Sequence, residues 1–93
     1  MPLFIVTIEY TKPMDLVEQH TPDHRAFLAG LKEKGQLLAS GPFDPRTGGM
    51  LIMQADSAET ADAITREDPF RKNEIAKYEV RGWKPTIGVE RFE

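Results

Sequence analysis

The residues of this sequence best suited to chemistry are a histidine, His24, and an aspartate, Asp68. Histidine exchanges protons near neutral pH, and an aspartate beside it fixes the tautomer of the imidazole and raises its basicity. Residue counting places each of them on the inward face of a predicted helix. We therefore predict that His24 and Asp68 form a catalytic acid–base pair. Each also has a simpler interpretation, His24 as a histidine satisfied within the core and Asp68 as a cap or turn residue before Pro69.

The first predicted helix begins at Thr21 and Pro22. A threonine side chain can accept from a free amide of the first turn, and a proline there loses no hydrogen bond. Four residues then recur at spacings of three and four and share one face, namely His24, Phe27, Leu28 and Leu31. Gly35 supplies the left-handed residue on which helices commonly end. The preceding residues, 11–20, are predicted to form a loop with one helical turn near 15–18.

The second predicted helix is capped by Ser57 and runs for roughly ten residues. Its inner face contains five residues, which are Ala58, Ala61, Ile64, Thr65 and, one turn later, Asp68. Pro69 ends the helix, because the residue before a proline is pushed out of helical geometry. Asp68 is thereby expected at the end of this helix, on the side that faces the sheet.

Four segments have the alternation and the β-branched or aromatic content of strands, and these are 3–10, 36–42, 50–55 and 75–83. Residues 43–49 are rich in Asp, Pro and Gly and predict a turn between the second and third strands. With the two helices, the order is βαββαβ, which predicts a ferredoxin-like α+β sandwich. Right-handed connections place both helices on one face of an antiparallel sheet. We expect one domain over residues 1–93, in which 85–93 form a polar tail.

The other face of that sheet carries Leu3 and Ile5 and would be bare in a monomer. An exposed apolar sheet face usually marks an interface. A chain of 93 residues buries only about 60–65% of its unfolded surface, so further burial in an oligomer would stabilise it. We therefore expect a homodimer in which two sheets pack face to face.

Composition excludes several classes of function. The net charge of −3 and a pI near 5.4 argue against nucleic-acid binding, since no basic stripe is present to neutralise phosphates. No apolar run approaches the ~20 residues of a membrane span, and no signal peptide is recognisable. The chain has no cysteine, which excludes disulfides, thiolate metal sites and thiol catalysis. A cytoplasmic location fits these features best.

Three segments, PDHRAFL, GQLLASGP and DPFRKNEIAKYEVRGWKP, resemble the YciI-like (YCII-related) proteins. The resemblance runs from the first strand to about Pro85. It implies a dimeric ferredoxin-like α+β barrel with an active-site dyad formed by His24 and Asp68. A relative that dechlorinates a chlorinated hydroxyquinol implies acid–base chemistry on small aromatic molecules without a cofactor.

The pocket beside the dyad is predicted to include residues of the second strand and two aromatic side chains, namely Ser40, Gly41, Pro42, Phe70 and Trp83. For each of these, ordinary packing or strand shaping is the simpler interpretation. His20 and His24 are four residues apart, but Pro22 lies between them and no third ligand is near in sequence. We therefore predict no metal site, and the resemblance implies that no cofactor is needed.

Three functions remain open at this point. The first is a cofactor-independent lyase or isomerase that acts on a small aromatic or enolisable molecule. The second is a non-catalytic module that binds a small ligand or serves as a dimerising accessory protein. Cofactor-free oxygenases and muconolactone-type isomerases are a third possibility, by fold analogy alone. Proton transfer needs His24 beside an open cleft, whereas a binding module needs only the cleft.

Overall fold

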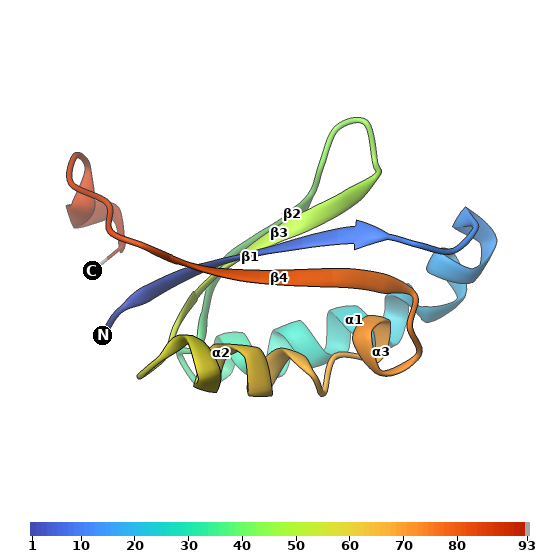
Figure 1. Ribbon diagram of the computed structural model, residues 1–93, viewed down its shortest axis with the longest axis horizontal. Helices are drawn as coiled ribbons and strands as arrows, with labels where there is room; N and C mark the ends of the chain where they lie inside the picture. The colour runs from blue at the N-terminus through green and yellow to red at the C-terminus, as the bar shows by residue number, and fades with distance from the viewer. Residues whose placement is uncertain (93) are drawn as a thin grey trace.

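The computed structural model describes residues 1–92, in which four strands form one antiparallel sheet (Figure 1). The strands are β1 (Leu3–Tyr10), β2 (Leu37–Pro42), β3 (Gly48–Gln54) and β4 (Ala76–Trp83). Their order across the sheet is β2-β3-β1-β4, with every neighbouring pair antiparallel. This is the strand order of the ferredoxin-like sandwich, so the predicted fold class is confirmed.

Three helices lie on the same side of this sheet (Figure 1). They are α1 (Met14–Glu33), α2 (Ala58–Thr65) and the single-turn α3 (Pro69–Lys72). The expected placement of the helices on one face is therefore confirmed, and α3 is an addition to the predicted pattern. No helix within residues 1–92 has both the length and the apolar character needed to cross a membrane.

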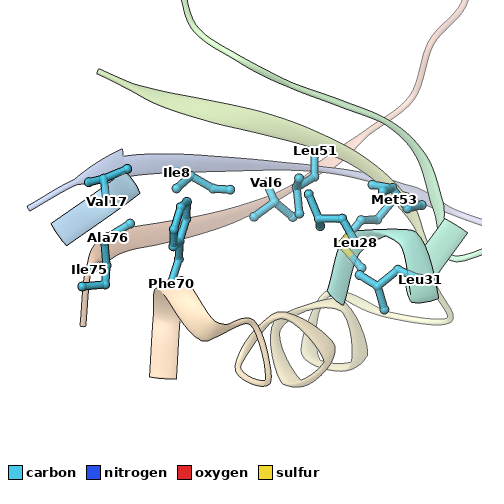
Figure 2. Packing of buried hydrophobic residues seen from close by; sticks show 11 residues of the cluster. Val6, Ile8, Val17, Leu28, Leu31, Leu51, Met53, Phe70, Ile75 and Ala76 are labelled. Atoms are coloured by element: carbon cyan, nitrogen blue, oxygen red, sulfur yellow. The ribbon is translucent and has the colours of Figure 1, made fainter. Parts of the chain in front are cut away.

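The core lies between the sheet and the helices. In β1 the side chains alternate, so that Phe4, Val6 and Ile8 are buried toward the helices while Leu3 and Ile5 face the other side. From the helices, Leu28 and Leu31 of α1 and Phe70 of α3 pack against this buried face (Figure 2). The opposite face of the sheet has no covering layer among residues 1–92, and this bears on the assembly considered below.

The start of α1 differs from the prediction. The helix begins at Met14 and continues through Pro22, which lies inside it. Val17 explains the difference, because it is fully buried in the core and extends the apolar stripe one turn before Thr21. The Thr21 hydroxyl donates to the Val17 carbonyl at 2.7 Å rather than capping a helix start. Pro22 is exposed, so water can satisfy the carbonyl that its missing N–H leaves free.

The helix signals at Gly35 and Ser57 are confirmed, but Pro69 does not end the second helix as predicted. Helix α2 already ends at Thr65, and Asp68 and Pro69 instead begin α3. Gly35 has φ of +75° directly after the end of α1, and Gln36 N–H donates to the Leu31 carbonyl at 2.9 Å. The Ser57 side chain accepts from the Thr60 N–H at 3.1 Å and caps α2. At the C-terminal end, Val89–Phe92 form a 3₁₀ turn within the predicted tail, and the last residue of that tail, Glu93, lies outside the described residues.

Candidate functional site

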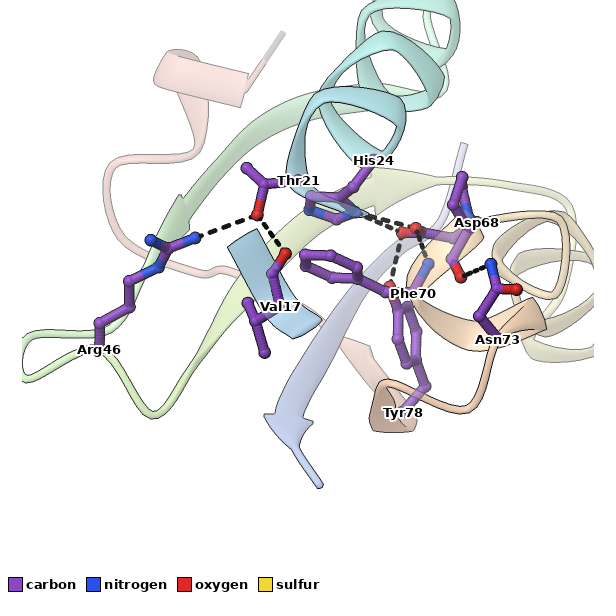
Figure 3. Close-up of polar contacts among 9 residues, drawn as sticks. Val17, Thr21, His24, Arg46, Asp68, Phe70, Asn73 and Tyr78 are labelled. Carbon is purple, nitrogen blue, oxygen red and sulfur yellow. Dashed lines mark hydrogen bonds and ion pairs between the residues drawn. The ribbon is translucent and has the colours of Figure 1, made fainter. Parts of the chain in front are cut away.

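His24 and Asp68 meet between α1 and α3. The Nδ1 atom of His24 lies 2.9 Å from both carboxylate oxygens of Asp68 (Figure 3). A carboxylate only accepts hydrogen bonds, so the neutral imidazole carries its proton on Nδ1. Asp68 is fully buried, whereas the His24 side chain remains 13% exposed. The remaining ring nitrogen, Nε2, is therefore the one that can exchange a proton with a bound molecule.

Asp68 is held in place by its position at the start of α3. Its Oδ1 accepts from the Phe70 backbone N–H at 3.0 Å, as expected of an N-cap residue followed by proline. The two interpretations of Asp68 given above are therefore compatible, since one carboxylate caps α3 and bonds His24. The cap fixes the direction of the carboxylate before any ligand is present.

Tyr78 completes the set of donors around Asp68, and the sequence prediction missed it. Its hydroxyl donates to Asp68 Oδ2 at 2.5 Å (Figure 3). Burial raises the pKa of Tyr78 well above its usual range, and the negative charge of Asp68 adds to this shift, so the hydroxyl remains a donor. The alternation of β4 could have placed Tyr78 on the inward face. Only the tertiary structure brings it to Asp68.

Phe70 sets the orientation of the imidazole. The His24 ring stacks on the buried Phe70 ring with centroids 4.0 Å apart and planes inclined by 8°. The Tyr10 ring contacts Phe70 edge-on, with centroids 5.9 Å apart. Stacking on one side and the Asp68 hydrogen bond at Nδ1 leave the imidazole little freedom to rotate.

Arg71 connects the helix turn that carries Asp68 to α2 and β4. Its Nη1 donates to Thr65 Oγ1 at 2.8 Å and pairs with Asp62 Oδ1 at 2.9 Å. The guanidinium also lies 5.6 Å from the centre of the Tyr78 ring. The hydrogen bond from Arg71 lowers the pKa of Asp62, so this pair is ionised at neutral pH. These contacts join the elements on which Asp68 and Tyr78 are placed.

A cavity of about 300 Å³ opens beside the dyad, between α1 and the end of the sheet where β2 and β3 meet. Its polar lining consists of Tyr10, Thr21, His24, Arg25, Ser40 and Arg46. Its remaining lining is apolar or glycine and consists of Ile8, Leu28, Gly41, Pro42, Gly49, Met50, Leu51 and Phe70. Four of the five residues predicted for the pocket lie here, namely Ser40, Gly41, Pro42 and Phe70, and Asp68 stands behind His24.

Ser40 reaches this cavity because of an irregularity in β2. The pairing of β2 with β3 shifts between Leu37 and Ala39, so one extra residue is accommodated there. As a result, Ser40 pairs with Leu51, whose side chain is buried toward the helices. In a regular strand Ser40 would point to the opposite face from Leu37.

Trp83 does not line this cavity, contrary to the expectation. It is the last residue of β4 and pairs with Leu3 at the far end of β1. Alternation along β4 also turns Trp83 to the uncovered face, opposite to the face of Tyr78. The sequence could not show that Trp83 lies far from His24, because the position of Trp83 depends on the register of β4 against β1.

The histidine pair lies on one continuous helix, since α1 runs through Pro22. His20 and His24 are therefore one turn apart, and proline does not separate them as predicted. His24 Nδ1 is already bonded to Asp68. Within residues 1–92, no group of three His, Asp or Glu side chains is placed so that it could hold a metal ion.

Comparisons with known proteins agree with this fold. The protein named "Uncharacterized protein YjpA" of Bacillus subtilis (strain 168) is 33% identical over 67 residues, which cover 72% of this chain and 79% of the relative. Among solved structures, the 5-chloro-2-hydroxyhydroquinone dehydrochlorinase TftG from Burkholderia phenoliruptrix AC1100, in complex with 2,5-dihydroxybenzoquinone, is similar with a TM-score of 0.78. The similarity covers 90% of this chain and 95% of that chain, at 25% identity.

A muconolactone isomerase shares the fold, with a TM-score of 0.69 and 18% identity over 92% of each chain. The model of the YCII-related domain matches residues 3–84, which is nearly the whole of the sequence. The order of strands, the two helical connections and this match agree. The chain belongs to the YCII-related family.

Proposed function

We propose that this protein is a lyase or isomerase that moves a proton on a small ring or enolisable molecule without a cofactor. The observation that carries the proposal is the His24 imidazole, which lines an open cavity while its Nδ1 is 2.9 Å from a buried carboxylate. A histidine that is merely structural would bond within a closed core. Here the second nitrogen is left for a ligand.

In the proposed reaction, His24 Nε2 takes a proton from the bound molecule and becomes an imidazolium. Asp68 stabilises that cation through Nδ1–H, because its carboxylate is buried and already oriented by the Phe70 amide and Tyr78. In an isomerisation, the same nitrogen returns the proton at another atom. In an elimination, the leaving group departs with the electrons of its bond, and the proton stays on His24 until water removes it.

The dehydrochlorinase similarity supports elimination from a hydroxylated ring as the first reaction to test. That enzyme is 25% identical to this chain over nearly its full length. The muconolactone isomerase supports only the fold, since it is 18% identical. A cavity of about 300 Å³ has room for a single ring with its substituents.

We also propose that the protein works as a homodimer through the uncovered face of its sheet. Leu3 and Ile5 of β1 and Ile52 of β3 lie on this face and are partly exposed. Ile5 and Ile52 are direct cross-strand partners, so they form a continuous apolar centre. No element of residues 1–92 covers this centre, and a second copy of the chain would do so.

The test of the catalytic proposal is a turnover assay with matched histidine variants. 5-Chloro-2-hydroxyhydroquinone and muconolactone are the first two substrates, followed by chlorinated and unsubstituted catechols. His24→Ala should lower turnover at least about a hundredfold, because general acid–base catalysis is lost. His20→Ala is the control, since it removes the histidine one turn earlier, which does not line the cavity.

Two results would overturn the proposal. The first is equal activity of the His24 and His20 variants. The second is saturable binding of these molecules without any turnover, which would make the protein a binding module.

A further inference from the structure

The cavity beside His24 carries positive charge without a compensating carboxylate. Two of its lining residues are arginines, Arg25 and Arg46, and none is an aspartate or glutamate. Within residues 1–92, neither arginine has a carboxylate within ion-pair distance. The chain as a whole has a net charge of −3, so the positive charge of the cavity is opposite in sign to the charge of the chain. A concave site lined by one sign of charge attracts ligands of the opposite sign.

Within residues 1–92, the hydrogen bonds of Arg46 go to neutral acceptors and are long. Its Nε donates to the Tyr10 hydroxyl at 3.3 Å, and its Nη2 donates to Thr21 Oγ1 at 3.4 Å (Figure 3). Its guanidinium lies 5.8 Å from the centre of the Tyr10 ring. Hydrogen bonds from a guanidinium to a carboxylate are shorter and roughly twice as strong as bonds to neutral groups. An incoming anion can therefore replace these contacts with a net gain.

The β2–β3 connection holds Arg46 over the cavity. Tyr10 N–H donates to the Thr47 carbonyl at 3.0 Å, and Phe43 N–H donates to the Gly48 carbonyl at 2.9 Å. Gly48 allows the connection to approach β1, since a Cβ atom there would lie 1.8 Å from the Ile8 carbonyl oxygen. The base of the loop is thus fixed, and the long side chain of Arg46 extends from it toward α1.

We infer that the cavity takes an organic anion, whose ionised group binds the guanidinium groups of Arg46 and Arg25. The rest of the ligand then lies on the apolar wall with its reacting atom at His24 Nε2. This inference rests on the proposed function for the reacting atom and on the two arginines for the charge. The Tyr10 hydroxyl, which accepts from Arg46, keeps its own proton free to donate to the same anion. Carboxylates and enolates carried by a small ring are the ligand class.

The test compares the binding of anions with that of neutral molecules of the same shape. The probes are benzoate with benzamide, and 3-hydroxybenzoate with 3-hydroxybenzamide, measured by calorimetry at low ionic strength. The wild-type protein should bind each anion about tenfold more tightly than its amide, the factor expected for a charge-assisted contact at a partly exposed site. The preference should shrink as salt is added. Equal affinity within both pairs would overturn the inference.

Matched variants separate binding of an anion from a purely structural role of Arg46. Arg46→Gln should abolish the preference while Arg46→Lys keeps part of it. Arg66→Gln, which removes an exposed arginine outside the cavity, should leave the preference unchanged. If Arg46 only secures the β2–β3 connection, anion and amide affinities will fall together in Arg46→Gln, and this result would also overturn the inference.

The binding measurements and the turnover assay of wild type and His24→Ala together distinguish the failure of the two proposals. A wild-type protein with the anion preference but no turnover on any substrate would retain this inference and overturn the catalytic function. Turnover that depends on His24, without any preference for anions, would do the reverse.

Discussion

One buried carboxylate, that of Asp68, receives three donors from three elements. These are the Nδ1–H of His24 on α1, the Phe70 amide of α3 and the hydroxyl of Tyr78 on β4. A buried charge is tolerated when its lone pairs are all bonded, and no buried side-chain polar atom of residues 1–92 lacks a partner. The arrangement orients the imidazole and stabilises the fold through the same atoms.

Asp68→Asn should change the protonation pattern of His24 because an amide cannot accept from all three donors. We expect the neutral imidazole to lose its preference for the proton on Nδ1, as measured by nitrogen chemical shifts in two-dimensional NMR. Activity should fall with it, and the free energy of unfolding should drop by about 1–3 kcal/mol. Glu67→Gln is the control, since it changes the exposed carboxylate next in sequence. An unchanged His24 spectrum in folded Asp68→Asn protein would contradict the dyad.

Tyr78→Phe should alter how stability depends on alkaline pH. The folded state raises the pKa of Tyr78 above its unfolded value of about 10, so the folded protein holds this proton more tightly. The resulting stability is fully present below pH ~10 and is lost as the pH rises further. Urea unfolding between pH 8 and 11 should therefore show a steeper loss of stability for wild type than for Tyr78→Phe. Parallel curves would show that the hydroxyl is not coupled to folding.

Among the elements, α1 and the β2–β3 connection decide where the cavity lies. Helix α1 continues through Pro22 because Val17 packs into the core one turn earlier. The β2–β3 connection lies close to β1 because Gly48, the first residue of β3, has no side chain. His24 is thereby fixed to one wall of the cavity and Arg46 to the other.

Gly48→Ala should be strongly destabilising because its Cβ would lie 1.8 Å from the Ile8 carbonyl oxygen, which belongs to the backbone and cannot move aside cheaply. We expect a loss of about 3 kcal/mol or more in the free energy of unfolding, measured by chemical denaturation. Gly41→Ala is the matched control, since a Cβ there meets nothing within 4 Å. A Gly48 variant as stable as the Gly41 variant would show that the β2–β3 connection can shift freely.

For the complete chain, the uncovered sheet face is the feature with the largest consequence. Its apolar centre, formed by Leu3, Ile5 and Ile52, is only partly exposed but has no covering layer among the described residues. Burial of this surface against a second copy would enlarge the small core of a 93-residue chain.

Light scattering at micromolar concentration should therefore report about twice the chain mass of 10.5 kDa. Ile5→Glu should shift the protein toward the monomer, because it would bury an unpaired charge at the centre of the interface. Ala63→Glu adds the same charge to an exposed position of α2 and should leave the mass unchanged. A monodisperse wild-type monomer over this concentration range would rule out the dimer.

The sequence by itself determined the features that depend on neighbours within a few residues. The alternation of β1, the cap at Ser57 and the glycine end of α1 at Gly35 all follow from local hydrogen bonds and periodicity. The same local rules placed His24 on the inward face of its helix, whereas Asp68 is buried as the cap of α3 and not as a residue of the second predicted helix. Together these patterns were sufficient to predict the βαββαβ order, and with the family resemblance they singled out His24 and Asp68 as a pair.

Only the tertiary structure decided which distant side chains meet. Tyr78 reaches Asp68, Arg46 reaches Thr21 and Trp83 pairs with Leu3 because of strand register and the connection between strands. The start of α1 was also missed, since the burial of Val17 outweighs the start signal at Pro22. Such contacts join residues far apart in the chain, and their energies depend on packing that no short stretch of sequence contains.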